Sequence, residues 1–139
     1  MLRGLTTTNF VVDDLRSAVD WYTELLGVEP YFIHDIDGTP AYIEFRIGDF
    51  QHELGFIASR FAPPSRLGPE TGKTLTYWAV DDVEATHKRL LSMGATTHED
   101  VTKRGPGFVT ASVIDPFGNV LGVMYNQHYL DIVASAKGA

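Results

Sequence analysis

The stretch "FVVDDLRSAVDWYTELLGVEP", Phe10 to Pro30, occurs a second time in altered form as "WAVDDVEATHKRLLSMGATTH", Trp78 to His98. Each copy reads as the end of a strand, then Val-Asp-Asp, an amphipathic helix and a glycine. The aspartates supply N-cap oxygens and negative charge at a helix start, and the glycine falls where a left-handed C-terminal cap is needed. A repeat at about half the chain length is too long for a solenoid unit and indicates a duplicated half-domain.

Strand patterns surround both helices. Residues 5–12 and 74–80 precede the helices, and three further strands follow each helix, separated by turn sequences such as "DGTP", "KRGPG" and "DPFGN". The following strands are expected at 28–35, 41–47, 51–58, 95–100, 108–114 and 120–126. Each half therefore reads β-α-β-β-β, which predicts an α+β fold.

A single domain is expected to cover residues 1–139. Module one spans 5–58, a linker rich in proline and glycine spans 59–73, and module two spans 74–126. The tail at 127–139 is alanine-rich and weakly patterned, so it is either a short helix or frayed.

The amino-acid composition limits the kinds of molecule that the protein is expected to bind. A hydrophobic content of 44% and a net charge of −7 describe an ordinary globular protein without the basic face that nucleic acid or an anionic membrane requires. The absence of cysteine excludes disulfides, thiolate metal sites and a cysteine nucleophile. The first residues contain no apolar signal core, so we expect a cytoplasmic protein.

The combination of "VVDDLRSAVDWYTELLG" early and "DPFGN" late in a duplicated β-α-β-β-β unit resembles the vicinal oxygen chelate superfamily. That superfamily includes glyoxalase I, extradiol dioxygenases and the bleomycin and fosfomycin resistance proteins. The resemblance covers residues 5–126 and implies two modules in a pseudo-twofold arrangement, forming a cupped mixed sheet with the helices on its convex side. Four-stranded modules have edges that must be covered, and relatives often pair modules between chains, so we expect a homodimer.

The resemblance also identifies where a metal would bind. Metal-binding members place one ligand on each of the first, fourth, fifth and eighth strands, and the matching residues here are Thr7, Glu53, Leu75 and Gly122. A divalent catalytic site needs about three or more protein nitrogen or oxygen ligands, and only Glu53 is a strong one. We therefore expect no metal and no other cofactor. The resemblance further suggests that glutamate at position 122 would fit, because glycine leaves space open there.

Other catalytic motifs find little support. The histidines show no metal-type spacing, and packing or surface roles are favoured for them: His34, His52, His87, His98 and His128. The Gly-x-Ser-x-Gly motif of a serine nucleophile is absent from the sequence.

Strand alternation predicts which side chains point into the cup. Aromatic rings, a thioether and a few polar groups would line it, which is typical of a pocket for a small molecule. The candidate ligand-binding residues are Thr7, Asn9, Arg46, Glu53, Leu75, Tyr77, Phe108, Gly122 and Met124. Tyr42 and Glu44 share the predicted face of Arg46, and Thr110 and Ser112 that of Phe108.

Glu53 is the best candidate for a catalytic residue, although none is established by the sequence. A carboxylate on an apolar strand needs a partner or water. One interpretation is an ion pair with Arg46 across the "GD" hairpin. The other is that Glu53 serves as a general base or as an acceptor that orients a ligand.

Two classes of function remain open. The first is a metal-free protein that binds a small, partly aromatic or cationic compound in its cup, as antibiotic-binding members of the resembled family do. The second is an enzyme of the lyase, isomerase or dioxygenase type that uses Glu53 as a base or within an altered metal site. An interaction module without a ligand is a third, lesser interpretation.

Overall fold

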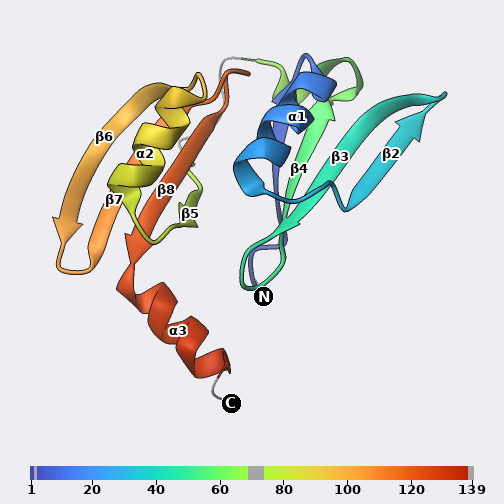
Figure 1. Cartoon of the computed structure of the whole chain (residues 1–139). Helices are drawn as coiled ribbons and strands as arrows, with labels where there is room; N and C mark the ends of the chain where they lie inside the picture. Colours follow the sequence, from blue (N-terminus) through green and yellow to red (C-terminus); the bar gives the residue numbers. More distant parts are fainter. Residues whose placement is uncertain (2, 69–73, 138–139) are drawn as a thin grey trace. The chain divides into compact units, whose positions relative to one another are not determined.

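The computed structural model describes Met1, residues 3–68 and residues 74–137. The chain divides into two compact units, Met1–Gly72 and Lys73–Ala139. Each unit contains one four-stranded sheet with a helix against it (Figure 1). The predicted α+β class and the two β-α-β-β-β halves are confirmed.

The first unit follows the predicted element order. Its elements are β1 (Thr7–Val12), α1 (Leu15–Leu26), β2 (Phe32–Ile36), β3 (Thr39–Ile47) and β4 (His52–Ala58), with two 3-10 turns, η1 (Ser59–Phe61) and η2 (Pro64–Arg66). The strand order is β1-β4-β3-β2. β1 runs parallel to β4, and the other neighbours are antiparallel.

The second unit repeats this arrangement. Its elements are β5 (Tyr77–Ala79), α2 (Val83–Ser92), β6 (Thr96–Gly105), β7 (Phe108–Ile114), β8 (Val120–Asn126) and α3 (Gln127–Lys137). The strand order is β5-β8-β7-β6, again with one parallel pair, β5 and β8. The tail therefore forms a helix, one of the two predicted alternatives.

Local interactions at the helix ends explain why the repeat folds this way. The Asp14 carboxylate accepts a hydrogen bond from the Ser17 amide, and the Asp82 carboxylate accepts one from Ala85, each at 3.0 Å. Gly27 follows α1 with a φ of 70°, a left-handed conformation that favours glycine. The predicted N-caps of both copies and the glycine cap of the first are thus confirmed.

The observed strand boundaries agree best with the predicted ones next to the turn sequences that are easiest to recognise. β7 and β8 begin and end as predicted, on either side of the "DPFGN" turn. β2 starts at Phe32 rather than at residue 28, after Pro30, which has no amide hydrogen to donate to a ladder. β6 runs on to Gly105 because its hairpin turn is tight, with Gly107 at a φ of 80°.

The core of the first unit is an aromatic cluster between α1 and one face of the sheet. Tyr22, Phe45 and Phe56 are fully buried. The Tyr22 ring centroid lies 4.6 Å from that of Phe56 and 6.3 Å from that of Phe10. These rings fix which face of the sheet packs on the helix, so the alternate residues of β1, β3 and β4 lie on the other face.

The core of the second unit is aliphatic. α2 packs on β6, β7 and β8, and its buried Val83 and Leu90 accompany Val113 and Val123 of the sheet. Among the residues that the structure describes, no helix is long and apolar enough to cross a membrane.

Neighbouring atoms of the chain lie very close to Gly122 of β8. A Cβ added there would be 2.6 Å from the Thr76 carbonyl oxygen and 2.9 Å from the Tyr77 ring. Gly105 of β6 has nothing within 4 Å of its added Cβ. The two strand glycines therefore form a matched pair, one crowded and one open.

We expect Gly122→Ala to destabilise the protein by about 1–3 kcal/mol, because the backbone carbonyl cannot move aside like a side chain. Gly105→Ala should be neutral or slightly stabilising, since it only restricts the unfolded chain. Urea denaturation of both variants measures the difference. Equal midpoints for the two variants would contradict the close contact at Gly122.

Candidate functional site

A cluster of polar side chains lies on the face of the first sheet that points away from α1. We call it the first-sheet cluster, and its members are Thr7, Asn9, Tyr42, Glu44, Arg46 and Glu53. Strand register brings them together: Thr7, Glu53 and Arg46 form one row across β1, β4 and β3. Asn9, Gly55 and Glu44 form the next row.

The cluster depends on the missing side chain of Gly55. A Cβ at that position would collide with the Tyr42 hydroxyl and would lie 2.6 Å from Asn9 Oδ1. The phenol of Tyr42 therefore lies across the strand, over Gly55, and its hydroxyl donates a hydrogen bond to Glu44 Oε1 at 3.0 Å. Glycine is needed here for close approach rather than for a turn.

Arg46 lies between the two carboxylates. Its Nη2 atom is 3.3 Å from Glu53 Oε1 and 3.9 Å from Glu44 Oε2. Its guanidinium carbon lies 4.3 Å from the centre of the Tyr31 ring. The ion pair between Arg46 and Glu53, one of the two interpretations of Glu53, is thus present. Two carboxylates and one guanidinium leave this cluster with one excess negative charge when both carboxylates are ionised.

Burial raises the pKa of Glu44 above the ordinary value for a glutamate, and the neighbouring Glu53 carboxylate raises it further. The hydrogen bond from Tyr42 and the charge of Arg46 act in the opposite direction and offset part of this rise. Burial also raises the pKa of Tyr42, and its hydrogen bond to Glu44 adds to the rise. Tyr42 is therefore a donor and Glu44 a carboxylate that takes up a proton easily.

Three polar atoms of the cluster have no partner. Thr7 Oγ1, Asn9 Oδ1 and Arg46 Nε are buried and make no hydrogen bond within the described part of the chain. A buried polar atom without a partner costs about 1–3 kcal/mol, and native proteins rarely keep one without a reason. The backbone of Asn9 is held in place, because Arg66 Nη2 donates to its carbonyl oxygen at 2.9 Å.

The predicted metal positions of the first unit are neighbours. Thr7 and Glu53 are paired across β1 and β4, and Glu44 adds a second carboxylate. No group of three or more histidine, aspartate or glutamate side chains that could hold a metal ion occurs among the described residues. The residues of the first-sheet cluster therefore do not fit the family's metal, since one of the two carboxylates is already paired with Arg46.

The remaining candidates lie in the second unit. Leu75 precedes β5 and is half-buried. Tyr77 is paired with Gly122, and Ala79 with Met124, across β5 and β8. The expectation that Gly122 leaves room for a glutamate was wrong, because the ring of Tyr77 and the carbonyl of Thr76 occupy that space.

Phe108 and Met124 both have contacts within the second unit. The Phe108 ring lies 5.4 Å, between centroids, from the ring of His128 at the start of α3. Asn126 Nδ2 donates to the sulfur of Met124 at 3.7 Å.

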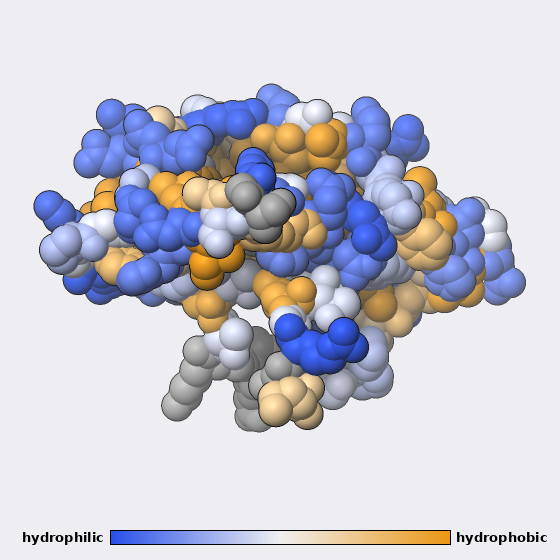
Figure 2. Space-filling view, turned by 90° about the horizontal axis from the view of Figure 1, so that it is seen from below, coloured by the Kyte–Doolittle hydropathy of each residue, from blue (hydrophilic) through white to orange (hydrophobic). Residues whose placement is uncertain are grey.

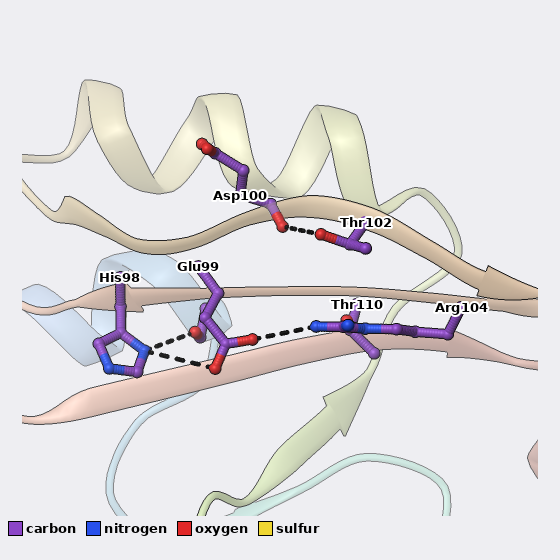
Figure 3. A network of polar contacts seen from close by, with 7 residues as sticks. His98, Glu99, Asp100, Thr102, Arg104 and Thr110 are labelled. Atoms are coloured by element: carbon purple, nitrogen blue, oxygen red, sulfur yellow. Dashed lines mark hydrogen bonds and ion pairs between the residues drawn. The ribbon is translucent and has the colours of Figure 1, made fainter.

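A second polar network crosses β6 and β7 (Figure 3). We call it the second-sheet cluster; it contains His98, Glu99, Arg104, Thr110 and Ser112. His98 Nδ1 lies 2.8 Å from Ser112 Oγ, Arg104 Nη2 lies 3.2 Å from Glu99 Oε2, and Arg104 Nε donates to Thr110 Oγ1 at 3.1 Å. These side chains satisfy one another.

The second-sheet cluster does not have the geometry of a site with a serine nucleophile. Ser112 is fully buried. Glu99 Oε1 is 4.0 Å from Nδ1 of His98, the same nitrogen that faces the serine, whereas a triad holds its carboxylate on the opposite nitrogen. His98 is exposed and lies against Ser112, which fits the packing or surface role that the sequence favours.

Sequence reasoning placed Tyr42 and Glu44 on the correct face but not among the binding candidates. Both are central to the first-sheet cluster. The signal that could have found them is the "YIEFR" stretch of β3, where Tyr42, Glu44 and Arg46 alternate with apolar residues. The role of Gly55 could not be predicted, because a glycine within a strand does not indicate which neighbouring side chain lies over it.

Comparisons with known proteins agree with this architecture. A structure from Sphaerobacter thermophilus DSM 20745, described as a member of the glyoxalase/bleomycin resistance protein/dioxygenase superfamily, matches with a TM-score of 0.69 and 19% identity, over 88% of this chain and 97% of that one. A glyoxalase-related enzyme from Fulvimarina pelagi matches with a TM-score of 0.68 and 18% identity, over 91% and 90%. A glyoxalase/bleomycin resistance protein/dioxygenase family enzyme from Burkholderia phytofirmans PsJN matches with a TM-score of 0.63 and 20% identity, over 88% and 98%.

At these identities the likeness shows the fold alone. No curated protein matches the sequence. The family model described as Glyoxalase/Bleomycin resistance protein/Dioxygenase superfamily, however, matches residues 4–123. Together with the two β-α-β-β-β halves, this match over most of the chain shows that the protein belongs to the glyoxalase/bleomycin resistance protein/dioxygenase superfamily.

Proposed function

We propose that this protein binds a small organic molecule on the polar face of its first sheet, and that it does so without a metal. The observation that carries the proposal is the set of three buried, unpartnered atoms in the first-sheet cluster, Thr7 Oγ1, Asn9 Oδ1 and Arg46 Nε. A ligand that hydrogen-bonds to them would recover free energy that the protein alone does not. Thr7 and Glu53 lie in the same cluster and complete the contact set.

The surroundings suit such a ligand. Tyr42 and Tyr31 supply aromatic surface beside the polar groups, and binding pockets combine apolar walls with a few polar groups that fix orientation. In the second unit, taken by itself, we propose Leu75, Tyr77, Phe108 and Met124 as candidate ligand contacts, whereas Gly122 is covered by Tyr77 and the Thr76 carbonyl.

An enzymatic function is the second candidate. The carboxylate of Glu53 is paired with Arg46 and lies beside Glu44, whose pKa is raised by burial. A pair of carboxylates in different environments can divide the roles of proton donor and acceptor. Isomerase or lyase chemistry with Glu53 as the base would use this pair, whereas metal-dependent chemistry would need ligands from outside the cluster.

We also propose a cytoplasmic homodimer. Hydrophobic side chains are visible at the surface between hydrophilic ones (Figure 2), and the edge strand β2 contributes Phe32, Ile33 and Ile36, which are 47%, 55% and 38% exposed. An exposed apolar edge strand is a liability that proteins usually cover. Pairing of β2 with a second copy would cover it.

Elemental analysis tests the metal-free proposal. Protein purified and dialysed without chelator should contain far less than one equivalent of zinc, nickel, iron or manganese per chain, because the first-sheet cluster offers too few ligands. About one tightly held metal per chain, lost together with ligand binding in Glu53→Gln, would contradict the proposal and favour the altered metal site.

Light scattering tests the dimer. The wild-type protein should have twice the mass of one chain at micromolar concentration, and Ile33→Lys should shift it to the monomer, because a charge on the edge strand opposes pairing. Ile132→Lys on α3 is the matched control, since Ile132 is 61% exposed, and it should leave the mass unchanged. A monomeric wild type, or loss of the dimer in the control only, would refute pairing through β2.

A further inference from the structure

The first-sheet cluster presents several hydrogen-bond acceptors close together. Its acceptors are the carboxylates of Glu44 and Glu53 and the unpartnered Asn9 Oδ1. Two of its donors are already used, the Tyr42 hydroxyl by Glu44 and Arg46 Nη2 by the nearer carboxylate, Glu53. A ligand that fits this face must therefore donate hydrogen bonds.

The charges of the cluster point the same way. Glu44 and Glu53 lie near one another with a single guanidinium, and the crowding of the two carboxylates raises the pKa of Glu44. Tyr42, Arg46 and Glu53 are the titratable or charged groups that act on Glu44, and Arg66 is committed to the backbone carbonyl of Asn9. A cation placed here would relieve the repulsion, whereas an anion would increase it.

Resting on the proposed function, we propose that the first-sheet cluster binds an organic cation with N–H donors, a primary ammonium or an amidinium group, between Glu44, Glu53 and Asn9. At a pH where Glu44 is protonated, the bound cation would take the place of that proton, which would leave to solvent. Arg46 Nε remains available to an oxygen atom of the same ligand. The second-sheet cluster has no such imbalance, because its Arg104 and Glu99 already pair.

The experiment compares three probes of nearly equal shape, benzylamine, benzyl alcohol and benzoate, by amide NMR titration of the full chain. At neutral pH, benzylammonium should shift the Thr7, Asn9 and Gly55 signals saturably, and the other two should bind at least about tenfold more weakly. Glu44→Gln should weaken benzylammonium binding about tenfold or more, as expected for loss of a charged hydrogen bond. The matched control Glu99→Gln should leave binding unchanged.

The pH dependence separates recognition from a merely structural role. Because a proton and the ammonium compete for Glu44, benzylammonium affinity should rise as the pH rises through the pKa of Glu44, and this rise should be smaller in Glu44→Gln. A profile that is the same in both proteins would overturn the role of Glu44.

The stability of the free protein gives a further readout. A carboxyl whose pKa is raised by folding stabilises the protein below its unfolded pKa, and this contribution is lost as the pH rises through the folded pKa. Glu44→Gln should therefore raise Tm at neutral pH by a few degrees, with a smaller gain at acid pH where Glu44 is protonated. A lower Tm at neutral pH would show that Glu44 is structural.

The outcomes distinguish this inference from the proposed function. If benzyl alcohol or benzoate shifts the same signals more strongly than benzylammonium, the cation preference fails while binding at the first-sheet cluster stands. If no probe shifts these signals at millimolar concentration, both fail.

Discussion

The close approach of a tyrosine to a strand glycine organises both halves of this protein. In the first unit, Gly55 lets the Tyr42 phenol lie across β4 and reach Glu44. In the second, Gly122 is covered by the ring of Tyr77 and by the Thr76 carbonyl. Neither glycine has a positive φ, so each is explained by lack of space for a side chain rather than by backbone conformation.

The two contacts have opposite consequences. At Gly55 the phenol brings a donor to a buried carboxylate and leaves Asn9 Oδ1 unpartnered, so the polar face is unsatisfied. At Gly122 the ring and the carbonyl fill the space that a side chain would need, at the residue that the resemblance matches to a carboxylate ligand. The duplicated halves thus diverged through their side chains while they kept the same strand order and one parallel edge pair.

Much of the fold could be predicted because its signals are local. Asp14 and Asp82 cap the helices through residues three positions away, and the "DPFGN" turn sets the limits of β7 and β8. The candidate site was harder to predict from the sequence, because its contacts join residues of different strands. Alternation placed Glu44 and Arg46 on one face, but the reach of Tyr42 over Gly55 and the filling of the space at Gly122 depend on side-chain directions that no sequence period contains.

Arg46 affects which cation the first-sheet cluster could hold. A divalent ion at Glu53 would bring two positive charges close to the Arg46 guanidinium, which lies 3.3 Å from that carboxylate. Few protein ligands would replace its water molecules, so little coordination energy would offset this repulsion. An ammonium brings one charge and N–H donors, which match the unpartnered oxygen of Asn9 and the crowded pair of Glu44 and Glu53. Under the proposed function, Arg46 would disfavour a metal, and Glu44 would favour a singly charged cation.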